Sequence, residues 1–436
     1  MVALLFHPVF GRLFAAQVLA LVGTGLLTVA LGLLAFDLAG AAAGAVLATA
    51  YTVKMVAYVG LSPVAGALVA RVPRKLVLIT ADLIRACVAL ALPFITEVWQ
   101  IYLAIFLLQT ASAVFTPTFQ ATIPDILGDE DDYAKALSLS RLAYDLENLL
   151  SPAIAGLLLL VISYHWLFGG TVLGFLLSAL IIARTALPAR STPKDRPFRA
   201  RLTRGIRIYI ATPRLRGLWF LTLTAAAGSA FVIVNTVVVV REGFGLADRD
   251  VALALACFGA GSMAAALTLP ALLRSLSDRP VMIGGAALMT ALMLLLAVLA
   301  PSWPLFLIVW ALMGLGYAAI ITPSGRLLRR SAHREDRQAA FTAQFTLSHV
   351  CWLITYPLAG STMTAWGMAA SMGILAAVGL FGIGMTLWVW PEGDPVVVTH
   401  SHPDLPDNHP HLAGKGHTHT HALIIDDEHH VWPTHG

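Results

Sequence analysis

The chain has 436 residues, of which 58% are hydrophobic and only 12% are charged, and its mean hydropathy is +0.79. Soluble globular domains carry about 25% charged residues, so this composition excludes a soluble protein and predicts a polytopic membrane protein. Three cysteines stand singly in apolar segments, which argues against a disulfide framework and a thiolate metal site. Without a nucleophile–base constellation, a glycine-rich phosphate loop or an ATPase motif, an enzyme or ATP-driven pump is not expected.

Long apolar runs, each suited to cross roughly 30 Å of hydrocarbon, follow one another along the chain. Because backbone groups in lipid must bond internally, we predict an all-α membrane protein of twelve transmembrane helices. The first run is too long for the apolar part of a cleavable signal peptide. The predicted spans are 11–36, 42–69, 76–95, 99–121, 136–162, 166–186, 217–240, 250–273, 280–300, 303–323, 340–362 and 367–390.

One long connection, residues 187–216, divides the spans six and six. The predicted parts are an N-terminal six-helix bundle (1–190), a middle loop (191–216), a C-terminal six-helix bundle (217–390) and a histidine-rich tail (391–436). Residues 190–217 hold nine basic residues against one Asp, which favours an anchor to anionic lipid over a nucleic-acid patch.

Orientation follows from the 28 Lys and Arg residues, which concentrate in cytoplasmic loops of membrane proteins. With the N-terminus inside, all but four of them fall on the cytoplasmic side or at its boundary. Arg241 and Arg249 fall outside, and Lys54 and Arg141 lie within spans. We therefore predict that both termini and the middle loop are cytoplasmic.

The fifth predicted span concentrates charges that lipid disfavours. Arg141, Asp145 and Asn148 share one helix face by their i, i+4, i+7 spacing, whereas Glu147 points about 200° away from Asp145. Two readings stay open: Arg141 and Asp145 neutralise each other, or Asp145 and Asn148 face a cavity and carry a cation or the coupled proton. We prefer Asp145 to Glu147 for this role because of its face.

Two further polar residues lie in mid-span. Lys54 is at the centre of the second span, where pairing with a carboxylate and a role in proton coupling are equally open. His349, in the eleventh span, is either a satisfied core histidine or a metal ligand, since imidazole suits Ni, Co, Zn and Cu. Aligning the Ala-Gly pairs at 155–156 and 359–360 places Asp145 opposite His349, as in a parallel repeat.

The loop between the second and third spans reads GALVARVPRK. With six plus six spans and a basic middle loop, it resembles the major facilitator superfamily, whose signature loop reads roughly G-x-L-x-D-R-x-G-R-K/R. The matching positions are Gly66, Leu68, Arg71, Arg74 and Lys75.

Ala70 stands where that signature has an Asp, and Pro73 stands at its second Gly. The family's Asp takes part in a charge cluster that latches the cytoplasmic side, so the resemblance implies a latch that is built differently here. The corresponding loop of the second half, SLSDRP, keeps Asp278 and Arg279 as further gate residues.

A narrower resemblance rests on LSPVAGALVARVPRK, ADLIRA, FTPTFQATIPDIL and SPAIAG. These stretches are similar to the drug and metal exporter branch of the superfamily, and the histidine-rich end makes the chain most similar to its nickel-resistance exporters. This resemblance implies proton antiport of a divalent metal, nickel or else Co, Zn or Fe, across the bacterial inner membrane. The metal is cargo, and no permanently bound cofactor is expected.

The tail holds ten of the fourteen histidines, spread among Pro, Asp and Thr. In HTHTH, alternate imidazoles of an extended strand lie about 7 Å apart, too far for one rigid site. The tail is expected to be disordered without metal and to capture divalent ions at several weak sites. An inert polar tail is the alternative. The tail residues predicted to bind metal are His417, His419, His421, His429 and His430.

Residues 129–133, DEDDY, are expected to form a solvated cytoplasmic loop, with a cation antechamber as the alternative. Three functions remain open: a proton-coupled metal exporter, an exporter of drugs or other organic solutes, and a metal-responsive sensor that does not transport. The expected partners are the lipid bilayer, metal ions and protons, not nucleic acid, and a monomer is expected.

Overall fold

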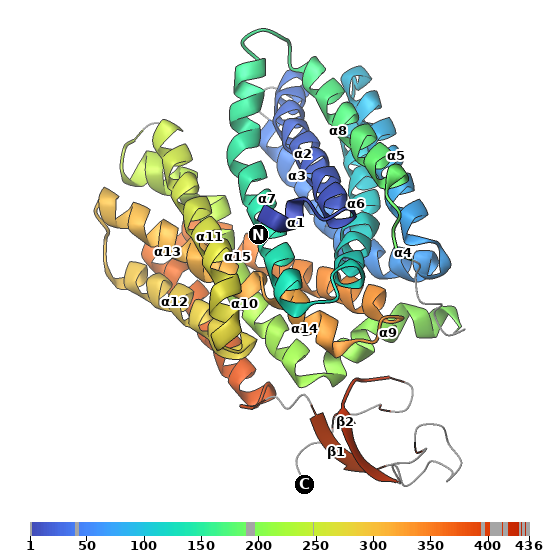
Figure 1. Ribbon diagram of the computed structural model, residues 1–436. Coiled ribbons are helices and arrows are strands. Elements are labelled where there is room, and N and C mark those ends of the chain that lie inside the picture. Colours follow the sequence, from blue (N-terminus) through green and yellow to red (C-terminus); the bar gives the residue numbers. More distant parts are fainter. Residues whose placement is uncertain are drawn as a thin grey trace.

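The computed structural model describes residues 2–39, 43–188, 197–246, 248–393, 397–401, 412, 417–426, 429 and 432 (Figure 1). The N-terminal half contains α1 (Val2–Leu5), α2 (Phe10–Ala39), α3 (Ala43–Val56), α4 (Ser62–Leu68), α5 (Arg74–Ala91), α6 (Val98–Ile126), α7 (Glu130–Leu158) and α8 (His165–Arg184). The C-terminal half contains α10 (Pro213–Val238), α11 (Asp248–Ser275), α12 (Asp278–Val298), α13 (Trp303–Ile321), α14 (Ser324–Ser331) and α15 (Arg337–Val389). Helix α9 (Phe198–Ala211) precedes α10, and short π or 3-10 turns are η2 (Ala57–Leu61), η3 (Val69–Arg71), η4 (Leu92–Phe94) and η5 (Val239–Gly243).

Ten helical segments of the described chain are long and apolar enough to cross a membrane. One of them, α15, contains both of the last two predicted spans, which meet at Gly367, where the backbone leaves helical geometry with φ of 76°. Glycine adopts this left-handed conformation without steric cost. Helix α7 carries the predicted fifth span and begins with three consecutive acidic residues. The helical class is confirmed, while the count of twelve spans stays a prediction.

The helices form two bundles that follow the two halves of the sequence (Figure 1). In the N-terminal bundle α2 packs on α8 and α5 on α6, and in the C-terminal bundle α10 packs on α15 and α11 on α13. Close approach relies on small residues: a Cβ atom on Gly261 would overlap the carbonyl oxygen of Ala311. Small residues at such contacts are the usual means of packing helices in lipid.

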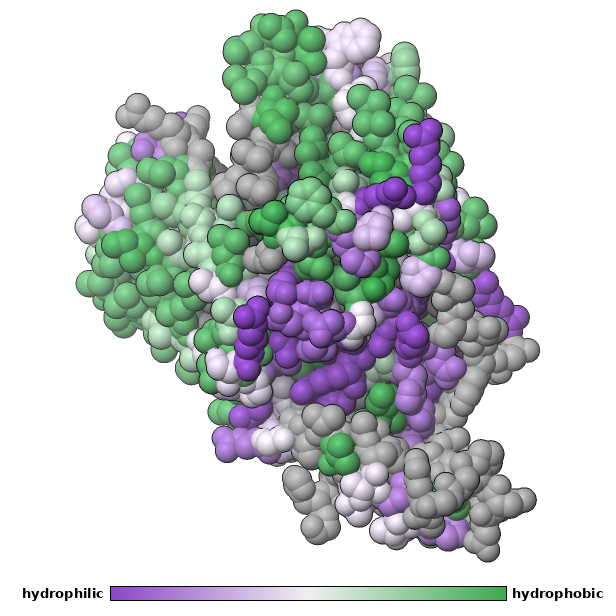
Figure 2. Space-filling model, viewed as in Figure 1, coloured by the Kyte–Doolittle hydropathy of each residue, from purple (hydrophilic) through white to green (hydrophobic). Residues whose placement is uncertain are grey.

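Hydrophilic residues gather in a band at one end of the bundles, between the apolar helices and the tail, as Figure 2 shows. This end, which carries α9, α14 and the tail strands, is called the tail side below (Figure 1). Large apolar side chains are exposed along the helices, among them Leu103, Leu180 and Ile308. Such exposure suits contact with lipid.

The predicted middle loop is corrected in part, because residues 198–211 form the amphipathic helix α9. Arg204, Ile208 and Tyr209 are buried, whereas Phe198 and Ile210 are exposed. Arg204 bonds Asp336 with an N–O distance of 2.6 Å, which fixes α9 to the C-terminal half. Contacts with the rest of the protein therefore stabilise a helix in a segment whose basic composition predicted a loop.

The expected disorder of the tail is also corrected for the residues that are described. Strands β1 (Val397–Ser401) and β2 (Thr418–Ala422) pair in antiparallel register. Their β-branched residues favour this geometry. Leu423 and Ile425, which follow β2, are 2% and 3% exposed. The tail therefore contains local order that a reading of its polar composition missed.

Candidate functional site

Three spans bring Lys54, Glu147 and His349 to the middle of the helical bundles. His349 lies 12 residues after the start of α15, about 18 Å along the axis at 1.5 Å per residue. Lys54 lies near the end of α3, and Glu147 is half-buried in α7. The Lys54 ammonium acts electrostatically on both Glu147 and His349. One basic residue, one carboxylate and one imidazole thus share a region at mid-depth.

Aromatic rings surround His349. Its Nδ1 lies 2.6 Å from the carbonyl oxygen of Phe345, and its ring centroid lies 4.6 Å from that of Tyr58 and 4.3 Å from that of Phe345. The ring centroid of Trp352 lies 6.0 Å from that of His349. A carbonyl oxygen only accepts, so Nδ1 carries the hydrogen in the neutral tautomer and Nε2 keeps its lone pair. Both earlier readings, core residue and ligand, remain compatible with this geometry.

Tyr58 links the two halves at this level. It lies in the π turn η2, which interrupts the second span, and its hydroxyl donates to Gln109 Oε1 at 2.6 Å. Lys54 Nζ lies 5.6 Å from the Tyr58 ring centroid, within range of a cation–π interaction. Single π turns inside helices are common at functional sites. The sequence analysis did not single out Tyr58, although its spacing of four residues from Lys54 places both on one helix face.

The rest of the predicted coupling cluster is described only in part. Asp145 and Asn148 lie in α7, but their side chains are outside the described residues. Arg141 reaches across to the other half, where its Nε donates to Ser262 Oγ at 3.0 Å and its guanidinium stacks on Tyr317 at 4.9 Å. Arg141 thus has partners beyond the Asp145 considered from the sequence.

A network of ion pairs joins the halves on the tail side. Asp125, at the end of α6, is 5% exposed in its side chain and binds Arg74 of its own half and Arg337 of the other. Arg334 Nε lies 3.4 Å from the same carboxylate. Gln338 Nε2 donates to Thr118 Oγ1 at 3.0 Å, also between halves. Asp125 is therefore the centre of a cross-half latch.

Two residues of the acidic stretch 129–133, Glu130 and Asp131, take part in this latch, and the stretch from Glu130 onward is helical and not a loop. Glu130 pairs with Arg326 at 3.0 Å and Arg329 at 3.1 Å, and Asp131 pairs with Arg274 at 2.9 Å. These arginines all belong to the C-terminal half. Three acidic side chains at the start of α7 also suit its positive helix end.

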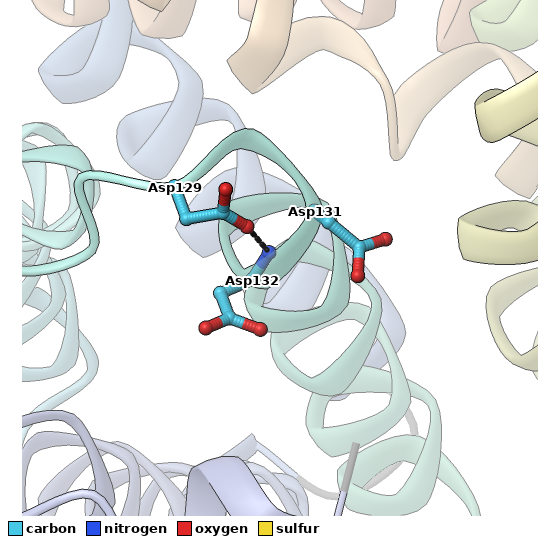
Figure 3. Close-up of side chains that lie close together, drawn as sticks. All are labelled: Asp129, Asp131 and Asp132. Carbon is cyan, nitrogen blue, oxygen red and sulfur yellow. Dashed lines mark hydrogen bonds between the residues drawn. The ribbon is translucent and has the colours of Figure 1, made fainter.

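Three carboxylates of this stretch lie close together, as Figure 3 shows. Asp129, Asp131 and Asp132 are the one group of metal-ligand type within 4.8 Å of one another in the described part of the chain. However, Asp129 accepts a hydrogen bond from the Asp132 amide at 3.0 Å, and Asp131 and Asp132 both pair with Lys135. Arg274 and Lys135 lower the pKa of Asp131 to about 2. These partners argue against a cation antechamber: Asp131 belongs to the latch, and the carboxylates of Asp129 and Asp132 bond within their own half.

The signature loop lies beside the latch. Arg74 is buried on Asp125, Lys75 is half-buried and Arg71 is exposed. A Cβ atom on Gly66 would lie 2.9 Å from Thr342 Cγ2 of the other half. Asp125 thus supplies a carboxylate near a loop that has Ala70 at the family's Asp position. The sequence analysis missed Asp125; the signal that could have found it is an acidic residue at the end of an apolar span, as in IPDIL.

The second gate loop contacts its own half. Asp278, 4% exposed, begins α12 and lies 3.3 Å from Arg326, the arginine that also binds Glu130. Arg279 donates to the carbonyl oxygen of Trp390 at 3.0 Å, and this bond holds the end of α15. Asp278 therefore supports the latch, whereas Arg279 lies near the root of the tail.

The hairpin pairs His419 of β2 with His400 of β1, and it pairs His421 with Val398. His417 directly precedes β2, and His419 is 7% exposed. His429 Nδ1 lies 2.9 Å from Asp426 Oδ1. His430 and the side chains of His400 and His421 lie outside the described residues. Directly opposed residues of antiparallel strands have Cβ atoms about 5 Å apart, so the second strand provides a partner that the sequence analysis did not foresee.

The sequence is similar to those of named bacterial exporters. The protein is 27% identical to the enterobactin exporter EntS of Shigella boydii over 323 residues, 71% of this chain and 74% of that one. It is 27% identical to macrolide efflux protein A of Streptococcus pyogenes over 184 residues, 41% of this chain. That second match spans only 45% of the length of the relative.

Two solved structures share the fold. The human organic anion transporter MFSD10 superposes with a TM-score of 0.73 at 12% identity, covering 86% of this chain and 98% of that one. A bacterial homologue of the iron transporter ferroportin, in an outward-facing state, superposes with a TM-score of 0.72 at 13% identity, covering 87% and 98%. The family model of the Major Facilitator Superfamily matches residues 13–272 and 218–416. The chain therefore belongs to the Major Facilitator Superfamily.

Proposed function

We propose that the protein is a secondary active exporter of a divalent transition metal, with nickel as the preferred cargo, driven by proton antiport. It resides in a bacterial inner membrane with both termini and the tail side in the cytoplasm. Export is supported by the similarity to EntS and macrolide efflux protein A, whose names describe exporters. The positive-inside distribution of Lys and Arg supports the orientation.

The observation that carries the metal proposal is the register of the tail hairpin. It sets His400 directly opposite His419, with His417 and His421 two residues away along β2. Imidazoles without Cys or Met favour borderline divalent ions such as Ni, Co and Zn. On the proposed orientation, this donor set lies on the side where export begins. Co, Zn and Fe are alternative cargoes.

Proton coupling is supported by the charges at mid-depth. Lys54 and Glu147 interact within the membrane, where an uncompensated charge costs several kcal/mol. Exchange of a proton for a cation needs a carboxylate that alternates between charged and neutral forms, and Asp145 and Glu147 are the residues proposed to serve. Asn148 is proposed to supply an amide oxygen to the cation. His349 Nε2 is the proposed imidazole ligand within the spans.

An organic solute is the second candidate cargo, and a specific observation favours it. Tyr58, Phe345 and Trp352 surround His349, and rings of this kind bind apolar molecules. Lys54 would repel a metal cation and attract an organic anion. A metal-responsive sensor that does not transport is the third candidate.

Uptake into inside-out vesicles separates these candidates. Ni, Co, Zn, Fe and Mn are offered in turn with an imposed proton gradient, and a labelled macrolide and a catecholate siderophore are offered in parallel. Gradient-driven nickel uptake supports the proposal. Organic uptake that is indifferent to metal supports the second candidate, and metal binding without any flux supports the sensor.

Two carboxylate variants test the coupling site. If Asp145 carries the proton or metal, Asp145→Asn should abolish gradient-driven flux in protein that is still folded and inserted. Glu147→Gln is the matched variant on the other face of α7. Full flux in Asp145→Asn with loss in Glu147→Gln would move the coupling role to Glu147. Loss of expression in Asp145→Asn would support its pairing with Arg141.

Histidine substitution in the tail tests capture. A chelator joined by a short linker raises the local metal concentration to the millimolar scale without creating a path across the membrane. Replacing His417, His419 and His421 by Gln in the full-length protein should therefore lower the rate at low metal and leave transport intact at saturating metal. A variant that is inactive even at saturation would place these histidines in the transport site itself.

A further inference from the structure

The end of the tail packs against the C-terminal bundle. Ile425 is 3% exposed and belongs to the main apolar cluster of that bundle, and Trp432 packs against the same cluster. Leu423 is 2% exposed. Apolar side chains of a mobile tether would remain in water, so their burial indicates a docked segment. We call the described residues from Leu423 to Trp432 the tail anchor.

Polar contacts tie the tail anchor to one short connection. The Arg214 guanidinium lies 4.9 Å from the Trp432 ring centroid, and its Nε donates to Ser331 Oγ at 2.7 Å. Asp426 Oδ2 lies 3.3 Å from His333 Nε2. Asp426 Oδ1 accepts from the amide of His429 at 2.7 Å, which orients the carboxylate. Ser331 is the last residue of α14, and His333 lies between α14 and α15. We call residues 330–337, which join the end of α14 to the start of α15, the gate connection.

The same gate connection supplies the latch. Arg334 and Arg337 reach Asp125 of the N-terminal half, and Asp336 holds Arg204 of α9. The connection is thus held by the tail anchor on one side and by Asp125 on the other. The anchor touches the C-terminal half, so it can influence the latch only by fixing the shape of this connection.

We propose that the tail anchor is an autoinhibitory element that holds the gate connection in its latching shape and so favours the state closed on the tail side. Detachment of the anchor frees Arg334 and Arg337 to leave Asp125, and the tail side then opens more often. The inference needs only alternating access, so it holds whether the cargo is a metal or an organic solute.

The effect of removing the anchor on the equilibrium between the closed and open forms can be predicted from the contacts present in each form. A contact present in only one of two states stabilises that state by its own free energy. Trp432 and Asp426 contact residues whose neighbours close the latch, so their removal should move molecules toward the tail-side-open form. A five-fold change in this equilibrium corresponds to about 1 kcal/mol.

A buried reporter makes the opening measurable. Ala121, in α6, is 0% exposed and packs within the apolar cluster of the opposite half. In full-length protein with Cys87, Cys257 and Cys351 replaced by Ala, Ala121→Cys gives a single thiol that is sealed while the halves are closed. Its rate of modification by a maleimide, in purified reconstituted protein, reports opening. Hydrogen exchange of residues 330–337 reports the gate connection itself.

Trp432→Ala and, independently, Asp426→Asn should raise the maleimide rate roughly five-fold and speed exchange in the gate connection. Trp388→Ala, which removes the same side chain from a position that is 79% exposed on α15, should change neither. Faster exchange with an unchanged maleimide rate would overturn the proposal, because the anchor would then touch the connection without controlling the gate. Unchanged values of both in the two variants would overturn it as well.

Discussion

The two ends of the helical bundles are held in different ways. On the tail side, Asp125, Glu130 and Asp131 of one half bind arginines of the other. At the opposite end, the described contacts stay within a half: Tyr164 donates to Asp37 at 2.5 Å in the N-terminal bundle. Figure 1 shows the bundles diverging toward that end.

The difference indicates how the halves can move. Within each half, helices meet through small residues and buried apolar side chains, contacts that are lost only with the fold. Between the halves on the tail side, many of the contacts are ion pairs. In the exposed pairs, such as Glu130 with Arg326, water can replace a partner at modest cost, whereas the buried pairs of Asp125 are stronger. Two rigid bodies joined by exchangeable ion pairs are suited to alternating access.

The largest expected effect comes from Asp125→Asn. This substitution leaves Arg74 and Arg337 without their shared carboxylate, and breaking a buried pair costs about 3–5 kcal/mol. We expect the tail-side-closed state to lose at least about 100-fold in relative population, measured by spin-label distances between the two halves. Asp132→Asn, a carboxylate paired with Lys135 in its own half, is the control. Unchanged distances in Asp125→Asn would show that other contacts hold the latch.

A smaller effect is expected at mid-depth from Arg141→Gln. The variant loses the contacts with Ser262 and Tyr317 across the halves, and a cation–π contact alone contributes about 0.5–2 kcal/mol. The closed population should fall roughly ten-fold, or about 1.4 kcal/mol. Arg184→Gln, at the exposed end of α8, is the control. A larger loss than in Asp125→Asn would place the main closure at mid-depth.

His349→Gln tests whether the mid-depth contacts bind cargo or only pack. As a metal ligand, its loss should weaken nickel binding at least ten-fold, about 1.4 kcal/mol, in calorimetry of full-length protein. As a core residue packed on Tyr58 and Phe345, its loss should lower the melting temperature and leave the affinity unchanged. Tyr58→Phe removes the hydroxyl and keeps the ring, and therefore serves as the packing control.

A few-fold effect of pH should test the link between the tail anchor and the latch. The hydrogen bond with Asp426 raises the pKa of His333, with Asp336 and Glu335 adding to it. A raised pKa means that docking is strongest below the ordinary histidine value and weakens as pH rises through the docked value. The protection factor of residues 330–337, which corrects the exchange rate for its intrinsic pH dependence, should therefore fall as pH rises above about 6.5. His333→Gln should remove this fall in protection.

The ion pairs of the latch should not themselves titrate over that range. The lowered pKa of Asp131, about 2, means that its own contribution is present above the ordinary carboxyl value and is lost only as pH falls toward 2. Any opening between the halves from about pH 6 to pH 8 should therefore come through the tail anchor. Spin-label distances between the halves should change with pH in the unaltered protein and stay constant in His333→Gln. Distances that change in both would show that another group controls the latch.

The smallest effect is expected at the opposite end. Tyr164→Phe removes the hydroxyl that bonds Asp37 within the N-terminal bundle. The equilibrium between closed and open states should not change, and the free energy of unfolding should fall by about 1 kcal/mol at most. A shift of the equilibrium would show that this end also joins the halves.

Sequence alone predicted the parts of this molecule that depend on local pattern. Apolar runs predicted the spans, and isolated polar residues within them pointed to Lys54, Glu147 and His349, which lie at mid-depth. The interactions of Lys54 with Glu147 and His349 come from different helices, and periodicity within one helix cannot reveal them. Asp125 was missed for the same reason, because its partner Arg337 is more than 200 residues away.

The tail shows a second limit. Alternating Thr and His in β2 are compatible with a strand, but a strand needs a partner, and β1 lies in an unremarkable stretch of Val, Thr, His and Ser. Helix α9 was predicted to be part of a loop whose basic residues anchor it to anionic lipid, whereas Arg204 is buried on Asp336. In both cases, long-range contacts override local composition.

Gly66 has a practical consequence. Its lack of a side chain lets α4 approach Thr342 of the other half, where even a methyl group would come within 2.9 Å. The size of the side chain at position 66 therefore sets how closely the two halves can approach on the tail side. Replacing Gly66 by progressively larger residues, from Ala to Leu, would hold the halves apart there by steric contact without altering any charge. Such a series would trap the protein with its tail side open and make that form accessible to structure determination.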